Sequence, residues 1–203
     1  MEPADIPPVR IVPANEASWD DLQAVLGSAD YPHYCQCQRQ IWGDGVWWYM
    51  PLEERAGHLR EQTASGNPIA PETSGIVAYL EGEPVGWCAV RPRTAYARLL
   101  NSRVPWAGRD EDREDDTVWA VVCFAVRKGY RGLGLTYALA RGAVEHARSR
   151  GARAIEGYPM ITSPDKEITW GELNVGPLGA FLDAGFREVT HPSKRRMVVR
   201  IDF

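Results

Sequence analysis

The feature that most constrains this fold is an unbroken apolar run, Val118 to Val126, followed by a glycine-containing turn and a helical pattern. A strand that is covered on both faces has such a run, whereas a strand with one exposed face alternates apolar and polar residues. After the turn, apolar residues recur every four positions at Leu135, Leu139, Ala143 and Ala147, as on the buried face of a helix. The sequence therefore predicts a central buried strand that leads into a long helix.

Shorter helices and strands are expected on both sides of this unit. Before it, we expect a strand over Val9–Val12, helices over Trp19–Leu26 and Pro51–Gln62, and a hairpin of Gly75–Leu80 and Val85–Val90 with a four-residue connection. After it, we expect a strand over Ala152–Tyr158, a short helix over Pro177–Ala184, and a closing hairpin of Phe186–Thr190 and Arg196–Phe203. The acidic stretch between Arg91 and Asp116 is interpreted as a solvated loop.

Length and charge narrow the class of protein. With 203 residues, 44% of them hydrophobic, the chain is expected to form one domain over residues 1–203, with residues 1–8 loose. A formal net charge of -4 argues against a nucleic-acid partner, because phosphate binding needs clustered Lys and Arg. Neither a signal peptide at the start nor an apolar run long enough for a membrane span is present, so we expect a soluble, cytoplasmic protein without a membrane partner.

The turn between the central strand and the long helix carries the chemistry. It reads Arg131-Gly132-Leu133-Gly134-Leu135-Thr136. Glycines let the backbone approach a ligand closely, and the unpaired N–H groups and dipole of a helix start favour an anion. The turn lacks the Gly-Lys-Ser/Thr ending of a P-loop and the ribose-binding acid of a Rossmann fold. It is interpreted as a cradle for a pyrophosphate.

This region resembles the GNAT acetyltransferase family, in which the central strand is followed by Arg/Gln-x-x-Gly-x-Gly/Ala at the start of a helix. Here Thr136 takes the last small-residue position, where it adds a hydroxyl to the phosphate site or crowds it slightly. The order of the expected elements and the ending Phe181 to Phe186 are also similar to the family. The resemblance implies an α/β GNAT acyl-CoA N-acyltransferase fold, with a mixed, mostly antiparallel central sheet flanked by helices.

The resemblance also implies roles for individual residues. Acetyl-CoA would be the co-substrate, with no metal, and Arg131 through Thr136 would hold its pyrophosphate. Backbone groups of Phe124, Ala125 and Val126 would bind the pantetheine arm, which adds itself like a strand. An amine, either a small molecule or a peptide, would attack the thioester directly in a ternary complex. The acceptor's identity and the oligomeric state, a homodimer included, stay open.

Phe181 departs from the family, because many members have a tyrosine there that protonates the departing thiolate. Phenylalanine has no proton to give, so the thiolate leaves unaided, which a thiol pKa of about 8.5 allows, or another group supplies the proton. Glu156 lies within a strand and is the candidate base, and Tyr158, which faces the same side, is a weaker candidate acid. The alternative for Glu156 is a structural ion pair. The rival function, a non-catalytic acyl-CoA sensor, depends on the missing hydroxyl at Phe181.

The aromatic segment from Tyr31 to Met50 has no clean period and is expected to be a loop or broken helix. With Trp42, Trp47 and Trp48, it is expected to pack over the acceptor cleft. Cys35 and Cys37, with His33, suggest a thiol-based or metal-based protein as a further alternative, but a closed zinc site needs four ligands and no second cluster follows. Cys123 on the central strand is either a covalent acyl carrier or inert packing.

Overall fold

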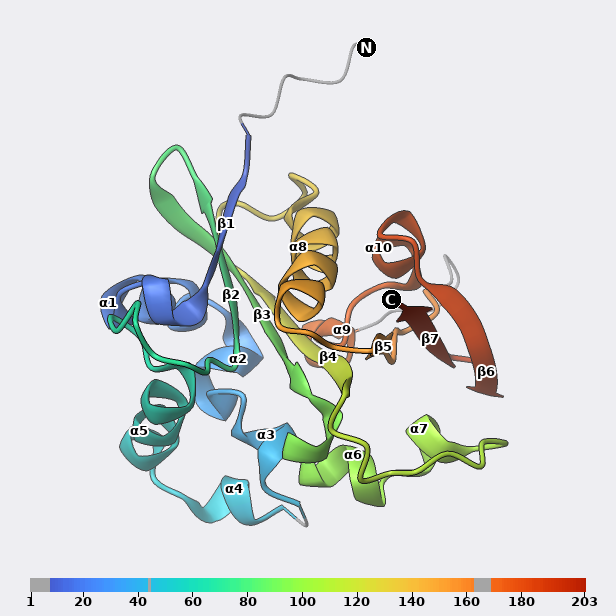
Figure 1. Cartoon of the computed structure of the whole chain (residues 1–203). Helices are drawn as coiled ribbons and strands as arrows, with labels where there is room; N and C mark the ends of the chain where they lie inside the picture. Colours follow the sequence, from blue (N-terminus) through green and yellow to red (C-terminus); the bar gives the residue numbers. More distant parts are fainter. Residues whose placement is uncertain (1–7, 44, 163–168) are drawn as a thin grey trace.

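A computed structural model describes residues 8–43, 45–162 and 169–203, and its centre is a seven-stranded sheet in the order β1-β2-β3-β4-β5-β7-β6 (Figure 1). The strands are β1 (Arg10–Pro13), β2 (Gly75–Leu80), β3 (Glu83–Pro92), β4 (Val118–Val126), β5 (Ala154–Gly157), β6 (Arg187–Ser193) and β7 (Arg196–Asp202). Neighbouring strands are antiparallel, except for the parallel pair β4 and β5. The predicted mixed, mostly antiparallel α/β sheet is confirmed. Most of the segment expected to be loose, 1–8, lies outside the described residues.

Helices cover both faces of this sheet. They are α1 (Trp19–Leu26), α2 (Asp30–Cys35), α3 (Gln38–Ile41), α4 (Val46–Tyr49), α5 (Leu52–Thr63), α6 (Ala97–Asn101), α7 (Arg103–Trp106), α8 (Leu135–Ser149), α9 (Trp170–Leu173) and α10 (Leu178–Asp183). Side chains of α1 and α5 pack into the core on one face, and those of α8 and α10 pack on the other (Figure 1). Across the described ranges, no helix combines the length and apolar character that crossing a membrane requires.

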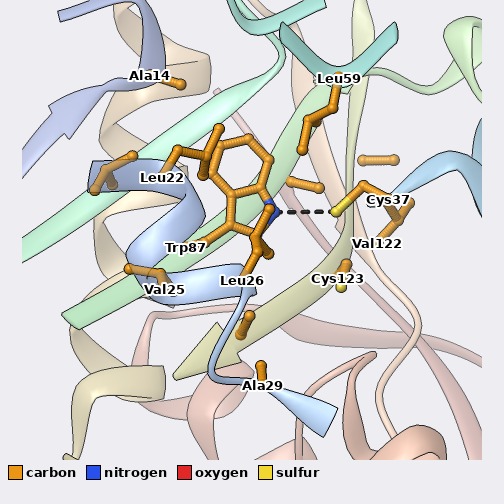
Figure 2. Packing of buried hydrophobic residues seen from close by; sticks show 14 of the residues in the cluster. Ala14, Leu22, Val25, Leu26, Ala29, Cys37, Leu59, Trp87, Val122 and Cys123 are labelled. Carbon is orange, nitrogen blue, oxygen red and sulfur yellow. Dashed lines mark hydrogen bonds between the residues drawn. The ribbon is translucent and has the colours of Figure 1, made fainter. Parts of the chain in front are cut away.

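Trp87 on β3 is the centre of the core beneath α1. Its side chain is fully buried and lies among Leu22 and Leu26 of α1 and Leu59 of α5 (Figure 2). Its indole Nε1 donates a hydrogen bond to Cys37 Sγ at 3.1 Å. Because Cys37 joins α2 to α3, this bond fixes those two short helices against the sheet.

The connection between β2 and β3 is shorter than the sequence predicted. Leu80 pairs with Glu83, so only Glu81 and Gly82 form the turn. Both have positive φ, 52° and 88°, as in a type I′ turn, whose twist matches that of paired strands. The four-residue connection was therefore wrong, because these two residues reverse the chain alone and Pro84 is already within β3.

A bulge in β4 creates the opening in which the candidate site lies. Ala89 pairs with Cys123 and Val90 with Val121, which leaves Val122 as the extra residue on β4. On its other side β4 pairs with β5 only from Val118 to Val121. Beyond the bulge, β4 and β5 therefore separate, and the β5-facing edge of β4 is open as far as Val126.

The close packing of α10 on the sheet gives a first prediction. A Cβ added to Gly157 of β5 would lie 2.1 Å from Cε1 of Phe181, a fully buried ring that packs edge-on against Phe124 and Phe186. We expect Gly157→Ala to lower the free energy of unfolding by about 1–3 kcal/mol, measured by urea denaturation. Gly57→Ala is the control, because Gly57 lies in α5 with open space around it and should gain up to about 1 kcal/mol. Unchanged stability of Gly157→Ala would contradict this packing.

Candidate functional site

The turn before α8 has the backbone geometry of an anion cradle. Gly132 and Gly134 have positive φ, 85° and 72°, which explains glycine at both positions, since no neighbouring atom would obstruct a side chain there. Gly134 is the N-cap of α8, and no side chain caps this end. The first N–H groups of α8, those of Leu135 and Thr136, therefore have no partner within the helix and are available to an anion.

A pocket of about 340 Å³ lies beside this turn and reaches along the open edge of β4. Its lining includes every residue predicted to bind the co-substrate except Leu133: Phe124, Ala125, Val126, Arg131, Gly132, Gly134, Leu135 and Thr136. Leu133 lies between the two glycines, faces a separate groove with Tyr137 and is 37% exposed. The side chain of Leu133 therefore lies outside this pocket, and a role of its backbone in the cradle stays a prediction.

The open edge of β4 already has one partner. The N–H of Phe124 donates to the carbonyl oxygen of Asn174 at 2.6 Å. Since N–H groups alternate between the two edges of a strand, the N–H of Val126 points to the same open edge. A ligand that lies along β4 can therefore use Val126 directly, but it must displace Asn174 to reach the N–H of Phe124.

A larger cleft of about 770 Å³ lies beyond the bulge of β4. Its walls come from α2, α3, α6, α7, α9, the residues that follow β5 and the start of β7. A small cavity of about 30 Å³ adjoins both the cleft and the pocket beside the cradle. It shares Tyr31 with both spaces, Asn174 with the pocket and Val122 with the cleft. The three spaces are thus neighbours, and Tyr31 is in the wall of each.

The aromatic segment contributes to the cleft differently from the prediction. Tyr31 and Tyr34, together with Gln40, line the cleft. The tryptophans of this segment do not: Trp47 is buried, and Trp48 is 62% exposed. The predicted broken helix is present as α2, α3 and α4.

Glu156, the candidate base, lies at the centre of a buried ion-pair network. Its carboxylate is fully buried. Its donors are Arg93 at 3.3 Å, Arg109 at 3.2 Å, the cross-strand partner Arg200 at 2.9 Å and the hydroxyl of Tyr158 at 2.9 Å. Both oxygens are occupied, and Glu156 lines neither the cleft nor the pocket. These contacts fit a structural ion pair, which was the alternative interpretation of Glu156. Its role as a catalytic base stays a prediction.

The acidic loop is also part of this network. Glu111 accepts from Arg109 at 2.9 Å and from Arg200 at 3.1 Å. Burial raises the pKa of Glu111, but the hydrogen bond and charge of Arg109 outweigh it and hold this pKa below its usual value. The expectation of a purely solvated loop was wrong here, because Glu111 is paired with Arg109 and Arg93 of the same loop and with the distant Arg200 of β7. The loop itself also contains α6 and α7.

Tyr158, the candidate acid, is the member of this network that reaches the cleft. Burial, and then the charge and hydrogen bond of Glu156, raise the pKa of Tyr158 well above its usual value. Its proton is directed at Glu156, so the phenol oxygen presents lone pairs rather than a proton to a ligand.

The cysteines line the small cavity between the two larger spaces. Cys35, Cys37 and Cys123 are all buried free thiols at its wall. The hydrogen bond with Cys37, followed by burial, raises the pKa of Cys123 well above its usual value. This favours the thiol over the nucleophilic thiolate, as expected of inert packing. In the part of the chain that the structure describes, no three His, Cys, Asp or Glu side chains converge as metal ligands would.

Two residues of the site were missed. Tyr31 belongs to the aromatic segment that the sequence singled out, but its place among three cavities depends on the packing of α2. Asn174 acts through its carbonyl oxygen, which every residue has, so its side-chain type gave no signal. Phe181, in contrast, lines none of these spaces and is core packing.

The buried network gives a second prediction. Glu156→Gln keeps the shape of the side chain but leaves three arginines without their shared charge. We expect the free energy of unfolding to fall by about 3 kcal/mol, measured by urea denaturation. Glu111→Gln is a matched control, because Glu111 contacts the same arginines at a side chain that is 36% exposed, and should cost less than about 1 kcal/mol. Equal losses would contradict a special role for burial.

Comparisons with known proteins agree with this geometry. The model of the acetyltransferase (GNAT) family matches residues 31–158, more than half of the chain. No curated protein sequence matches the chain.

Solved structures share the fold at low sequence identity. An N-acetyltransferase from Staphylococcus aureus Mu50 is 12% identical, with 96% of this chain and 98% of that chain covered and a TM-score of 0.53. A GCN5-related N-acetyltransferase from Kribbella flavida is 16% identical, with 96% and 98% covered and a TM-score of 0.53. A ribosomal-protein-alanine N-acetyltransferase from Brucella melitensis is 16% identical, with 97% and 99% covered and a TM-score of 0.51. With the family model, the sheet and the cradle before α8 in agreement, the chain belongs to the GNAT acetyltransferase family.

Proposed function

We propose that this protein transfers an acetyl group from acetyl-CoA to a primary amine, by direct attack of the amine on the thioester in a ternary complex. The observation that supports the proposal is that Tyr31 lines the pocket beside the cradle, the separate cleft and the small cavity that shares residues with both. Two neighbouring spaces let both substrates bind at once. Holding them together converts a bimolecular step into an effectively unimolecular one.

The co-substrate would bind along β4. The N–H groups at the start of α8 and the charge of Arg131 favour the pyrophosphate, and the edge of β4 near Val126 suits the amide groups of the pantetheine arm. The small cavity of about 30 Å³ would then receive the acyl group. Its size favours acetyl over longer chains, since each further methylene needs space that this cavity lacks.

The departing thiolate needs a proton, and Tyr31 is the group that we propose to supply it. Tyr31 lines the pocket, the cleft and the small cavity next to both, where the thioester would lie. Tyr158 would accept a hydrogen bond from the attacking amine, since its own proton is held by Glu156. The proton that the amine nitrogen loses as the C–N bond forms and the C–S bond breaks would pass to solvent in the cleft. Phe181 is fully buried, so its missing hydroxyl does not favour a non-catalytic sensor.

The first test of this function is calorimetric titration of the protein with acetyl-CoA, followed by thiol release over a panel of amines. We expect Arg131→Glu to lose detectable binding, because it puts a negative charge against the pyrophosphate. Arg187→Glu is the control for the charge change alone, since Arg187 is exposed on β6, away from the pocket. Equal affinity of Arg131→Glu and the unmodified protein would refute the cradle.

Tyr31→Phe tests the proton donor. We expect the rate of thiol release at saturation to fall about 100-fold, the usual range for loss of a general acid, with acetyl-CoA affinity retained. Tyr34→Phe is the matched control, because Tyr34 lies on the same helix, lines the cleft but not the pocket, and is 58% exposed. Similar rates for the two variants would exclude Tyr31 from this role.

A further inference from the structure

The larger cleft carries an excess of positive charge. Three arginines from separate elements line it: Arg39 of α3, Arg98 of α6 and Arg196 at the start of β7. Helices α3 and α6 lie side by side (Figure 1), and Arg39 is near enough to Arg196 for their charges to repel. Glu172 is the one carboxylate among the described residues that line the cleft.

That carboxylate does not neutralise the three arginines. Glu172 forms its ion pair with Arg195 at 3.2 Å and closes a capping box with Thr169 at the start of α9. Within residues 8–43, 45–162 and 169–203, none of Arg39, Arg98 and Arg196 has a carboxylate within ion-pair distance. Among the described residues, their charge is therefore not balanced by a carboxylate.

The Arg196 side chain is held in place, but one of its hydrogen-bond donors has no partner among the described residues. One terminal nitrogen donates to the backbone carbonyl of Tyr158 at 2.9 Å, which fixes the guanidinium at the wall of the cleft. Its Nε is buried and has no hydrogen-bond partner among the described residues. Burial, followed by the charges of Arg39 and Arg195, lowers the pKa of Arg196. A buried donor without a partner is costly, so the described residues do not fully satisfy Arg196.

The rest of the wall is largely apolar. It includes Leu99, Val122, Met160 and Val175. A cleft that combines apolar walls with a few charged groups binds a ligand with an apolar body and one oriented polar group. The planar fork of arginine matches the paired oxygens of a carboxylate or phosphonate.

We propose that the acceptor is a primary amine that also carries an oxyanion, a carboxylate or a phosphonate, which Arg39, Arg98 and Arg196 bind. This inference rests on the proposed function, because it names the substrate class of the same cleft. An acceptor that is only a cationic amine would be repelled by the three guanidinium groups.

The experiment compares matched acceptors. Amino acids with apolar bodies and increasing separation of amine and carboxylate are each paired with their carboxamide, with aminoalkylphosphonates as a further series. Thiol release from acetyl-CoA gives kcat/KM for each. We expect the best oxyanion acceptor to exceed its carboxamide by at least about 10-fold, the effect of one charge-assisted hydrogen bond.

Substitutions of the three cleft arginines test whether these residues cause the preference for an oxyanion acceptor. Arg98→Gln is the cleanest, since among the described residues Arg98 has no side-chain hydrogen bond or ion pair to lose. Arg39→Gln and Arg196→Gln follow. Each should lower kcat/KM for the oxyanion acceptor about 10-fold and leave the carboxamide unchanged. Arg103→Gln is the control, because Arg103 is exposed between two residues of the cleft, Ser102 and Val104, but does not line it.

Each outcome decides the inference. Carboxamides or simple amines that equal the oxyanion acceptors would overturn it and leave the acetyltransferase function intact. If no amine is acetylated although acetyl-CoA binds, the proposed function fails, and calorimetry with 3-phenylpropionate and its amide decides the cleft separately. Tighter binding of the carboxylate, lost in Arg98→Gln and kept in Arg103→Gln, would support the oxyanion site, and equal binding would refute it.

Discussion

Beyond Val121, the β5-facing edge of β4 has no strand beside it, and the candidate site depends on this interruption of the sheet. Open backbone N–H and C=O groups are costly when they are buried, so an interruption in the middle of a sheet needs another partner. The carbonyl of Asn174 supplies one bond to Phe124. The remaining groups border a pocket that ends at the start of α8, so the place where β4 lacks a neighbour is also the place where a ligand can act as one.

Packing on the α1 face determines the shape of the cleft. The bond from Trp87 to Cys37 holds the junction of α2 and α3 against β3 (Figure 2), and those helices present Tyr31 and Arg39 to the cleft. The junction is strained, because Gln36 and Cys37 both have positive φ. Such conformations cost on the order of 1 kcal/mol each and persist only where surrounding contacts determine them.

Hydrogen bonds between glutamine side chains provide part of that support. Gln36 bonds to Gln23 of α1 at 3.0 Å, and Gln38 bonds to Gln62 of α5 at 3.0 Å. The strained junction is thus tied to both helices that cover this face. The lining of the cleft therefore depends on residues that never touch it.

Local sequence signals predicted the elements that position the site. The apolar run coincides with β4, and Ser18 caps α1 by accepting from the N–H of Asp21 at 3.0 Å. The two glycines before α8 indicated the cradle because positive φ restricts the residue type. Each of these signals arises within a few neighbouring residues, which is why one sequence can reveal them.

Long-range contacts could not be predicted in the same way. The ion-pair partners of Glu156 are Arg93, Arg109 and Arg200, which lie at separate places along the chain. No local sequence pattern indicates that these side chains meet. For the same reason the sequence pointed to tryptophans at the cleft, although tyrosines of the same segment line it. The single-domain organisation stays a prediction, and the oligomeric state stays open.

The parallel pairing of β4 with β5 also has a mechanical consequence. It spans four residue pairs, from Val118 opposite Ala154 to Val121 opposite Gly157. Through the sheet, this short seam alone joins the first four strands to the last three. The seam lies where β4 and β5 begin to separate. A small rotation about it therefore changes the distance between the separated ends of the two strands far more than it changes their pairing. A rotation about this seam, which is as short as the pairings of β1 with β2 and of β5 with β7, would therefore widen or narrow the space for a ligand.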